Sequence, residues 1–353
     1  MFTETSVGSP VRRRLLGLLA GPHGVDRYTE LVDPMWTSEV RATVVRVCRS
    51  TPRSVTLWLR PNHPIAPLAG QYLTVSVEID GRRHTRCYSP ASRHRPDAEG
   101  LPLIELTVAR HDGGVVSEYL YRAARAGMTL GLSGPAGDFV LPIPRPRRLL
   151  LIAGGSGITP VMAMVRTLQQ ERYDGRVAVL HYVRSLDDAC YREQLATLPQ
   201  VSVLHACTRG PGGDLQGHVD GGHLAAAMAD PDAVYVCGPP ALVEAVRRHY
   251  PDAVAESFAP APLVIPGTPV GGRITFGRSR IDVDNDGRAL LDQADSAGLT
   301  PASGCRMGIC HTCTRRKVHG VVRNVTTGAI STGDDEAVQI CVSVPVGDVE
   351  IDL

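Results

Sequence analysis

The chain has 353 residues, of which 43% are hydrophobic and 21% are charged, a composition typical of globular proteins. Its 37 lysine and arginine residues nearly balance 36 aspartate and glutamate residues. This balance excludes a nucleic-acid-binding protein that relies on a global basic charge, and it excludes an acidic disordered chain. No apolar run approaches the ~18 residues of a transmembrane helix. The length predicts two or three domains.

Residues 1–37 are expected to form an amino-terminal extension. Arg12–Arg14 and the apolar stretch Leu15–Ala20 predict a short basic helix. The stretch is too short for a signal peptide, so we expect a cytoplasmic protein whose cysteines stay reduced. A basic helix can also rest on a membrane surface. Two interpretations therefore stay open: a peripheral contact with the inner face of the membrane, or a solvated extension packed on the next domain.

Short strands with alternating apolar and polar residues follow in residues 38–142 and predict a small antiparallel β-barrel. Asp80-Gly81 is typical of a hairpin turn. One helix is expected in this domain, at Ser117–Ala126. The predicted strands are Glu39–Val47, Ser54–Leu59, Gln71–Ile79 and Leu103–Ala109.

A proline-rich linker, residues 142–146, leads to residues 147–258, where strands and helices alternate. This alternation predicts an α/β domain with a doubly wound parallel sheet. The predicted strands are Arg148–Ala153, Val177–Tyr182, Val201–Ala206 and Ala233–Cys237. The predicted helices are Val161–Glu171, Ala189–Leu198, Gly222–Ala229 and Ala241–His249.

A second linker, residues 259–272, precedes a small last domain, residues 273–353, which holds a cluster of cysteines. Cys305, Cys310 and Cys313 have the spacing C-x4-C-x2-C, and Cys341 follows later in the chain. This is the plant-type spacing of [2Fe–2S] ligands. The alternative, a zinc site, usually takes two close cysteine pairs, and here the second pair is missing. Because four thiolates suffice, we expect His311 and His319 to face solvent.

A glycine-rich turn follows the first strand of the α/β domain, at Gly154–Pro160. Its glycines allow a backbone to approach a pyrophosphate closely, and Thr159 and Pro160 suit the cap and the first position of the next helix. Cys237-Gly238-Pro239-Pro240 ends the fourth strand, at the edge where such sheets bind ligands. Each motif alone also fits a plainer interpretation: an ordinary turn, or a buried cysteine.

Two motifs in the barrel point to a second ligand. In Arg86-Cys87-Tyr88-Ser89 the arginine can pair with a phosphate, the tyrosine can stack on a ring and the serine can hydrogen-bond a ring nitrogen. The turn Gly113–Ser117 leads into a helix and can cradle an anion. The plainer interpretation is a turn with a surface arginine.

Together these motifs resemble the ferredoxin–NADP reductase superfamily, in the form with a fused plant-type ferredoxin. The motifs occur in the family's order across residues 38–353. The resemblance implies an FAD-binding antiparallel β-barrel, an NADP-binding doubly wound α/β domain and an α+β ferredoxin domain of the β-grasp type. It implies a [2Fe–2S] cluster bound by Cys305, Cys310, Cys313 and Cys341.

The resemblance also implies the roles of single residues. Ser89, Cys237 and Glu256 would lie at the reacting atoms. The flavin would contact Arg86, Tyr88, Ser89, Thr107, Val108, Gly114, Val115, Val116, Ser117 and Phe258. The pyridine nucleotide would contact Gly155, Ser156, Gly157, Thr159, Pro160, Cys237, Gly238 and Pro239. Acceptor recognition would use the surface around the cluster, where we expect Arg306, His311 and residues 315–317.

Two choices of cofactor rest on finer features. The turn at Gly113–Ser117 looks more like the FAD members, although a related class with the same domains carries FMN. Arg184, Thr208 and Arg209 follow the second and third α/β strands, where a cation can hold a 2′-phosphate, so NADPH is favoured over NADH. If the arginines are only solvated surface residues, this preference falls away.

The amino-terminal residues narrow the resemblance further. Asp26–Tyr28, Leu31–Pro34 and His84–Ser92 look like the reductases that serve membrane acyl-CoA Δ9-desaturases. The sequence thus predicts an electron relay from NADPH through FAD and the cluster to an oxygen-activating iron enzyme, with a desaturase as protein partner and no nucleic acid. The alternatives are a reductase of a soluble ring-hydroxylating oxygenase or cytochrome P450, and, from another class, a redox sensor without turnover.

Overall fold

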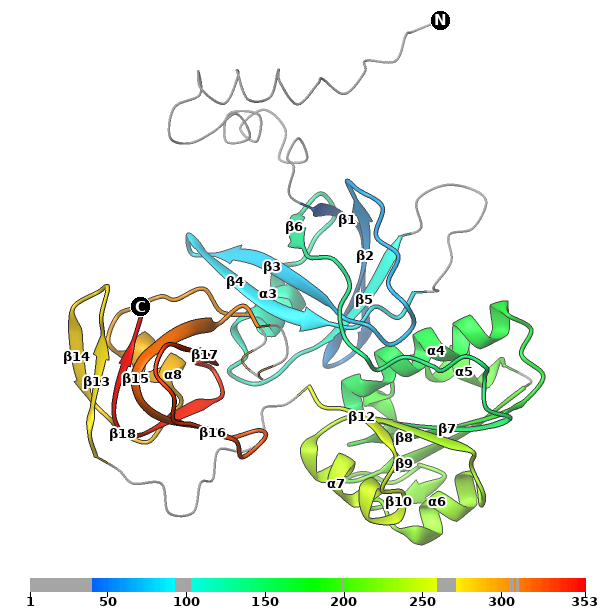
Figure 1. The fold of residues 1–353 in the computed structure, drawn as a ribbon. Helices are drawn as coiled ribbons and strands as arrows, with labels where there is room; N and C mark the ends of the chain where they lie inside the picture. The colour runs from blue at the N-terminus through cyan, green and yellow to red at the C-terminus, as the bar shows by residue number, and fades with distance from the viewer. Residues whose placement is uncertain are drawn as a thin grey trace, which may run out of the picture.

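The computed structural model describes residues 40–92, 103–198, 200–258, 271–304, 306, 308 and 311–353. These residues form three sheets in chain order, each with buried hydrophobic residues of its own (Figure 1). The predicted amino-terminal helix, most of the linker 259–272, and two predicted cluster ligands, Cys305 and Cys310, lie outside the described residues.

The first sheet is a barrel-like antiparallel sheet with the strand order β4-β3-β6-β1-β2-β5. The β3–β4 turn has φ angles of 51° at Asp80 and 73° at Gly81, the left-handed pair that an Asp-Gly hairpin turn requires, which confirms the predicted turn. Helix α3, Val115–Ala123, packs Val116 and Leu120 into this core. The strands are β1 (Arg41–Thr51), β2 (Ser54–Pro61), β3 (Leu73–Ile79), β4 (Arg82–Tyr88), β5 (Ile104–Ala109) and β6 (Thr129–Leu132).

The second sheet is wholly parallel, with the order β10-β9-β8-β7-β11-β12. Side chains alternate between its faces: Leu149 and Leu151 belong to one buried cluster, and Leu150 and Ile152 to another. Helices α4 and α5 cover the first face, and α6 and α7 cover the second. This is the predicted doubly wound sheet. Its strands are β7 (Arg148–Gly154), β8 (Arg176–Val183), β9 (Val201–Cys207), β10 (Leu215–Gln216), β11 (Ala233–Cys237) and β12 (Val254–Glu256).

The helices of this domain begin and end close to their predicted positions, with one exception. Helix α5 contains only Arg192–Ala196, whereas the apolar pattern predicts a helix from Ala189. The difference arises because Tyr191 has a left-handed φ of 64°, which prevents the helix from beginning earlier. The helices are α4 (Ile158–Gln170), α5, α6 (Gly221–Ala227) and α7 (Pro240–His249).

The third sheet is mixed and has the order β14-β13-β18-β15-β16, with β17 also paired to β15. Helix α8, Leu290–Ser296, packs Leu290, Leu291 and Ala294 against it. A helix on a mixed sheet agrees with the predicted α+β ferredoxin domain. The strands are β13 (Arg273–Phe276), β14 (Ile281–Asp284), β15 (Thr314–Asn324), β16 (Ile330–Ser331), β17 (Glu336–Gln339) and β18 (Ser343–Ile351).

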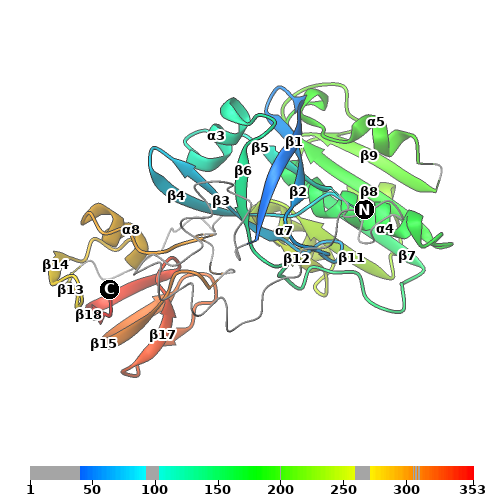
Figure 2. The same ribbon diagram turned by 90° about the horizontal axis from the view of Figure 1, so that it is seen from above.

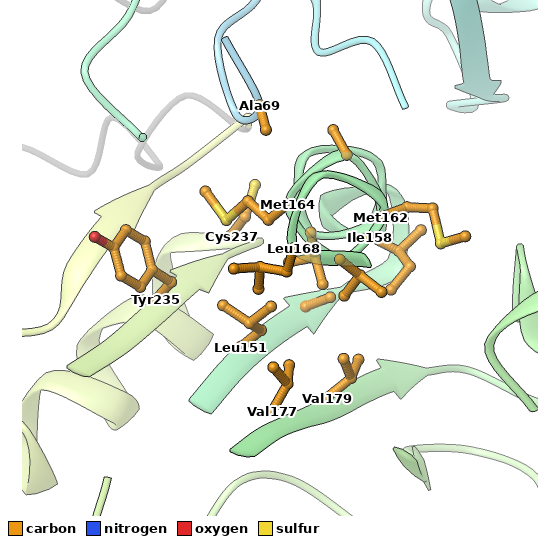
Figure 3. Close-up of a cluster of buried hydrophobic side chains, with 14 of the residues drawn as sticks. Ala69, Leu151, Ile158, Met162, Met164, Leu168, Val177, Val179, Tyr235 and Cys237 are labelled. Carbon is orange, nitrogen blue, oxygen red and sulfur yellow. The ribbon is translucent and has the colours of Figure 1, made fainter. Parts of the chain in front are cut away.

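The first sheet lies between the other two. In both views the third sheet is on the side of strands β3 and β4, away from the second sheet (Figures 1 and 2). The first and second domains share a hydrophobic cluster around α4. Figure 3 shows this helix above the strands of the parallel sheet, with Ala69 of the first domain reaching the same cluster. Among the described residues, no helix has the length and apolar character needed to cross a membrane.

Candidate functional site

Ser89 lies just beyond strand β4, two residues before Ala91, which belongs to the hydrophobic cluster that the first two domains share. The Ser89 side chain is buried, with 2% of the residue exposed. Its Oγ has no hydrogen-bond partner among the described residues. Burial also raises the pKa of the neighbouring Tyr88 phenol. An unpaired buried hydroxyl costs free energy unless a ligand supplies the partner, so this end of β4 fits the flavin ring that the motif predicts.

Arg86, two residues before Tyr88, contacts the third domain. Its Nη1 donates to the carbonyl of Thr85 at 2.7 Å and to the carbonyl of Gly304 at 3.4 Å. Gly304 immediately precedes the predicted cluster ligand Cys305. A residue predicted to bind the flavin therefore also touches the loop predicted to bind the cluster.

Strand β5 carries Thr107 and Val108, whose side chains point into protein. Thr107 Oγ1 is 2.7 Å from Thr56 Oγ1 and also hydrogen-bonds the hydroxyl of Tyr191. Val108 is fully buried in the core of the first domain. Neither side chain is open to a ligand in this structure, so a flavin contact at these positions would use the backbone.

The turn before α3 and the first residues of this helix differ in how far their side chains are exposed. Gly114 caps the helix, and no side chain accepts the first N–H groups. Ser117 Oγ donates to the Gly114 carbonyl at 3.2 Å, which closes the turn on itself. Val116 is 1% exposed and belongs to the core, whereas Val115 is 46% exposed. The amino end of this nine-residue helix has no side-chain cap, and it therefore fits the phosphate predicted here.

The glycine-rich turn of the second domain differs from its prediction at the helix start. A short 3₁₀ turn over Gly155–Gly157 precedes α4, and Gly157, not Thr159, caps the helix. Thr159 and Pro160 are buried as the second and third helical residues, and Thr159 Oγ1 donates to the Ser156 carbonyl at 3.2 Å. The predicted cap is wrong because the 3₁₀ turn already directs the chain into the helix.

The two glycine motifs of the second domain meet at the carboxyl edge of the sheet. A Cβ on Gly157 would lie 2.0 Å from the carbonyl oxygen of Cys237, and one on Gly238 would lie 3.1 Å from Gly154 Cα. A Cβ on Gly154 would similarly meet Pro239 Cδ at 2.7 Å. Only glycine permits this approach. Gly155, with φ 53°, and Ser156 remain at the surface of the joined turns.

Cys237 and Glu256 are direct neighbours on the parallel strands β11 and β12. The thiol lies 3.9 Å from Glu256 Oε2. Burial raises the pKa of Glu256 to about 7, and burial together with this carboxylate raises the pKa of Cys237 well above its usual value. A Cβ on Gly137 of the first domain would lie 4.0 Å from Glu256 Oε1. The pair therefore lies at the border with the first domain, and Cys237 shares a hydrophobic cluster with Ala91, two residues after Ser89.

Phe258 follows β12 and packs against the hydrophobic cluster that contains Cys237 and Phe139. It is half-buried at the border of the two domains. The Glu-Ser-Phe motif therefore reaches the first domain, as the family resemblance implies for the end of the nucleotide domain.

Arg184, Thr208 and Arg209 follow the adjacent strands β8 and β9. The Arg209 N–H donates to the Arg184 carbonyl at 3.0 Å. Both arginines are exposed, and in the described part of the chain neither forms an ion pair. Thr208 differs, because its hydroxyl donates to the Val183 carbonyl at 3.2 Å. The charge of Arg184 also helps to lower the pKa of Asp112, so this arginine lies near the first domain.

His181 is a buried residue of the nucleotide turn that sequence reasoning missed. Its Nε2 lies 3.1 Å from the Gly155 carbonyl, and burial lowers its pKa to about 3, so the ring is neutral. The Ala153–His181 pairing of β7 and β8 brings it under the turn. No motif signals this role, because it depends on strand register.

Two of the four predicted cluster ligands are described. Cys313 and Cys341 are buried in the core of the third domain, and the Ile340 N–H donates to the Cys313 carbonyl at 3.4 Å. Around them the loop has left-handed φ angles at Arg306, Gly308 and His311, of 58°, 77° and 55°. Left-handed residues in a loop can turn backbone N–H groups toward an anion, which suits an iron–sulfur centre.

The surroundings of the cluster loop agree only in part with their prediction. His311 and His319 are exposed, as expected. Lys317 is not part of the acceptor-facing surface: it is fully buried, and its Nζ donates to the carbonyls of Gly320 and Gly333. The two carbonyls draw the ammonium inward, whereas sequence pattern alone places a lysine at the surface.

An open hollow of about 700 Å³ lies elsewhere, at the amino ends of the parallel strands. Arg148, Arg176 and Ser202 contribute to its lining. It is at the opposite edge of the sheet from the glycine turns and takes no part in the candidate site.

Comparison with known proteins agrees with this arrangement. Residues 42–141 match the oxidoreductase FAD-binding domain, residues 151–248 the oxidoreductase NAD-binding domain, and residues 275–346 the 2Fe-2S iron-sulfur cluster binding domain. A curated relative, an NADPH oxidoreductase of Mycobacterium tuberculosis, is 32% identical over 97% of this chain and 92% of its own length. The chain belongs to the ferredoxin–NADP reductase superfamily, in the form with a carboxyl-terminal [2Fe–2S] domain.

Two further proteins are similar over most of the chain. The glycine betaine monooxygenase reductase subunit of Pseudomonas aeruginosa is 30% identical over 80% of this chain and 86% of its own length. The solved structure of a phthalate dioxygenase reductase covers 90% of this chain and 98% of its own, with a TM-score of 0.61 and 22% identity, which supports the fold. This protein is thus an NAD(P)H-dependent oxidoreductase, and its domains confirm the predicted cofactors: FAD, a pyridine nucleotide and a [2Fe–2S] cluster.

Proposed function

We propose that this reductase takes electrons from NADPH and delivers them to an external oxygen-activating iron enzyme, with a membrane acyl-CoA desaturase as its partner. When bound, FAD accepts a hydride, and the [2Fe–2S] cluster carries single electrons. The observation that carries the proposal is that Cys237 and Glu256 pair beside Gly137 of the first domain, while Ser89 lies two residues before Ala91, which shares a hydrophobic cluster with Cys237.

The residues of the border have distinct proposed tasks. Ser89 Oγ, buried and unpaired, would hydrogen-bond the flavin ring. The joined turns of Gly157 and Cys237 would hold the nicotinamide end of the nucleotide against it, and the buried Glu256 would keep water away from the reacting atoms. Nothing in this arrangement needs a general acid–base triad, since the transferred group is a hydride.

The proposed preference for NADPH rests on Arg184 and Arg209. Their exposed guanidinium groups sit on adjacent strand ends and could bind a 2′-phosphate with charge-assisted hydrogen bonds. A ribose without that phosphate gains nothing from two cations. The name of the mycobacterial relative, an NADPH oxidoreductase, supports the same donor.

The desaturase is proposed from two sets of motifs. One is His84–Ser92, which the structure describes; the others are the amino-terminal motifs, which lie outside the described residues. A second candidate acceptor is a soluble oxygenase. It is favoured by the likeness to the glycine betaine monooxygenase reductase subunit. If the partner is a membrane desaturase, we propose that this reductase is cytoplasmic and contacts the inner face of the membrane.

The test is a reconstituted assay of stearoyl-CoA desaturation. Membranes that contain a Δ9-desaturase are mixed with NADPH or NADH, with and without the holoenzyme, and cytochrome c reduction runs alongside. Oleoyl product that depends on the protein and on NADPH supports both donor and acceptor. Active cytochrome c reduction without desaturation would overturn the proposal of a desaturase partner and favour a soluble oxygenase. Equal rates with NADH and NADPH would overturn the proposed preference for NADPH.

A further inference from the structure

Arg166, on helix α4 of the nucleotide domain, reaches across to the flavin domain. Its Nη1 donates to the carbonyl of Ala91 and to Glu105 Oε2, the latter at 3.1 Å, while Nη2 donates to Gln194 Oε1 at 2.6 Å. The side chains of Arg166 and Glu105 are 14% and 12% exposed. A nearly buried ion pair between two domains is costly to form unless all its donors are used, and here three acceptors share one guanidinium.

Tyr191 adds a second connection beside the first. Its ring lies under the Arg166 guanidinium, with 5.3 Å between the ring centroid and Cζ. Its hydroxyl hydrogen-bonds Thr107 Oγ1 on strand β5. Tyr191 is held at a left-handed φ of 64°, a conformation that a tyrosine rarely adopts. Backbone strain of this kind persists only where surrounding contacts fix it, and it is common at functional sites.

The four residues Arg166, Glu105, Tyr191 and Thr107, here called the interdomain clamp, are tied to both halves of the proposed site. Ala91, which accepts from Arg166, lies two residues after Ser89. Helix α4, which carries Arg166, begins at the glycine-rich turn. The clamp thus joins the segment proposed to hold the flavin to the helix that follows the nucleotide turn.

We propose that the interdomain clamp positions the two domains for hydride transfer, and that Arg166 and Tyr191 are positioning residues of this reaction. The inference rests on the proposed function at the domain border. With both groups bound, the rate of hydride transfer from nicotinamide to flavin would depend steeply on how closely Arg166 and Tyr191 hold the two domains together. A misplacement of ~1 Å can cost ~100-fold in rate.

The chemistry of the clamp explains why arginine is required. Arginine presents its donors in a fixed planar fork, so one side chain can serve Ala91, Glu105 and Gln194 together. Lysine keeps the charge but has a single donor centre. The Arg166→Lys variant should therefore keep the ion pair and lose the bridge to the Ala91 segment.

The test compares Arg166→Lys and Tyr191→Phe with two matched controls in the full-length holoenzyme. Arg148→Lys alters an arginine paired with Asp232 at the far edge of the sheet, and Tyr173→Phe removes a hydroxyl that donates to the Pro146 carbonyl. If an Arg166 variant folds poorly, Arg166→Met combined with Glu105→Gln removes both buried charges together.

Two measurements are made on each variant. Stopped-flow reduction by NADPH should show hydride transfer slowed ~10- to 100-fold in the clamp variants, with KM for NADPH unchanged. Hydrogen–deuterium exchange should show faster exchange of the Ala91 amide, which donates to the Glu105 carbonyl at 2.8 Å, and of the β5 amides. The controls should change neither quantity.

Several outcomes would overturn the clamp: variants that match the controls, a slower rate with unchanged exchange, or a change in KM alone. Failure of the wild-type holoenzyme to oxidise NADPH would instead overturn the proposed function. The exchange comparison would still decide whether these residues hold the two domains together.

Discussion

Ser89 and Glu256 are single residues whose burial is unfavourable for the folded chain alone. Ser89 Oγ lacks a partner among the described residues, and Glu256 has its pKa raised to about 7 by burial. Groups that weaken the fold are often kept because a ligand or a reaction uses them. Both positions therefore allow stability and activity to be separated by substitution.

Replacing Ser89 with alanine should stabilise the flavin-free protein and slow the reductase. The substitution removes an unpaired buried hydroxyl, which relieves ~1–3 kcal/mol, and it removes the proposed contact with the flavin, which should slow reduction by NADPH ~10- to 100-fold. Thermal unfolding and stopped-flow reduction measure the two effects. Thr167→Val, which removes another unpaired buried hydroxyl, should stabilise without slowing. A destabilised Ser89→Ala protein with normal reduction would contradict this role.

Glu256 should make stability depend on pH. Its folded pKa, about 7, lies above the usual glutamate value of 4.5, so the folded state holds the proton more tightly than the unfolded state. Its favourable contribution is complete below pH 4.5 and is lost as the pH rises toward 7. Glu256→Gln mimics the neutral acid. Relative to the wild type, its free energy of unfolding should therefore increase between pH 4.5 and pH 7, by at most ~3 kcal/mol above pH 7. Denaturant unfolding at pH 4, 6 and 8 checks this, and an equal effect at every pH would refute it.

At the scale of elements, the fold could be predicted wherever hydrophobic pattern and turn chemistry were strong. The apolar run Leu149–Ile152 predicts strand β7, and the Asp80-Gly81 pair predicts the turn between β3 and β4; the structure has both. In the first two domains, strands β4, β6, β10 and β12 are not among the predicted strands. Strand β4 is rich in charged residues, and the other three have only two to four residues each. The motifs identified most of the candidate site. The partners of Arg166 and His181 could not be predicted, since register and domain contacts are not encoded in local pattern.

The contact between the two glycine turns should not tolerate a side chain. In Gly157→Ala the new Cβ would lie 2.0 Å from the Cys237 carbonyl, so the turns must separate. We expect a loss of ~1–3 kcal/mol in stability and a ~10-fold rise in KM for NADPH, equivalent to ~1.4 kcal/mol of binding. Gly134→Ala, where a Cβ meets no atom within 4 Å, is the control. Equal KM values for the two variants would show that the turns do not form one nucleotide site.

Strand β15 should depend on its buried lysine. Lys317→Met leaves the Gly320 and Gly333 carbonyls without their donor, at a cost of ~1–3 kcal/mol for each buried group. The cluster absorbance should be lost at a lower temperature, while flavin reduction by NADPH is unchanged. Arg316→Ala removes an exposed pair with Asp335 and should have little effect. A Lys317→Met cluster as heat-stable as the wild type would contradict this structural role.

At the scale of the whole molecule, the second and third domains both contact the first domain, the barrel. The second domain meets it through the shared core around α4, and the third meets it where Arg86 Nη1 donates to the Gly304 carbonyl. The proposed nucleotide and cluster sites therefore border the proposed flavin site from different sides (Figures 1 and 2). This order matches a relay in which the flavin stands between a two-electron donor and a one-electron carrier.

The most direct measurement of this relay compares the wild type with Cys313→Ser in anaerobic reduction by NADPH, followed by transfer to cytochrome c and to ferricyanide. Cys313 is buried in the core of the third domain, far along the chain from the nucleotide motifs. We predict that the variant keeps flavin reduction and ferricyanide activity but loses at least ~10-fold in cytochrome c reduction, because its cluster lacks a thiolate ligand. Unchanged cytochrome c reduction would show that electrons leave the protein without passing through the cluster.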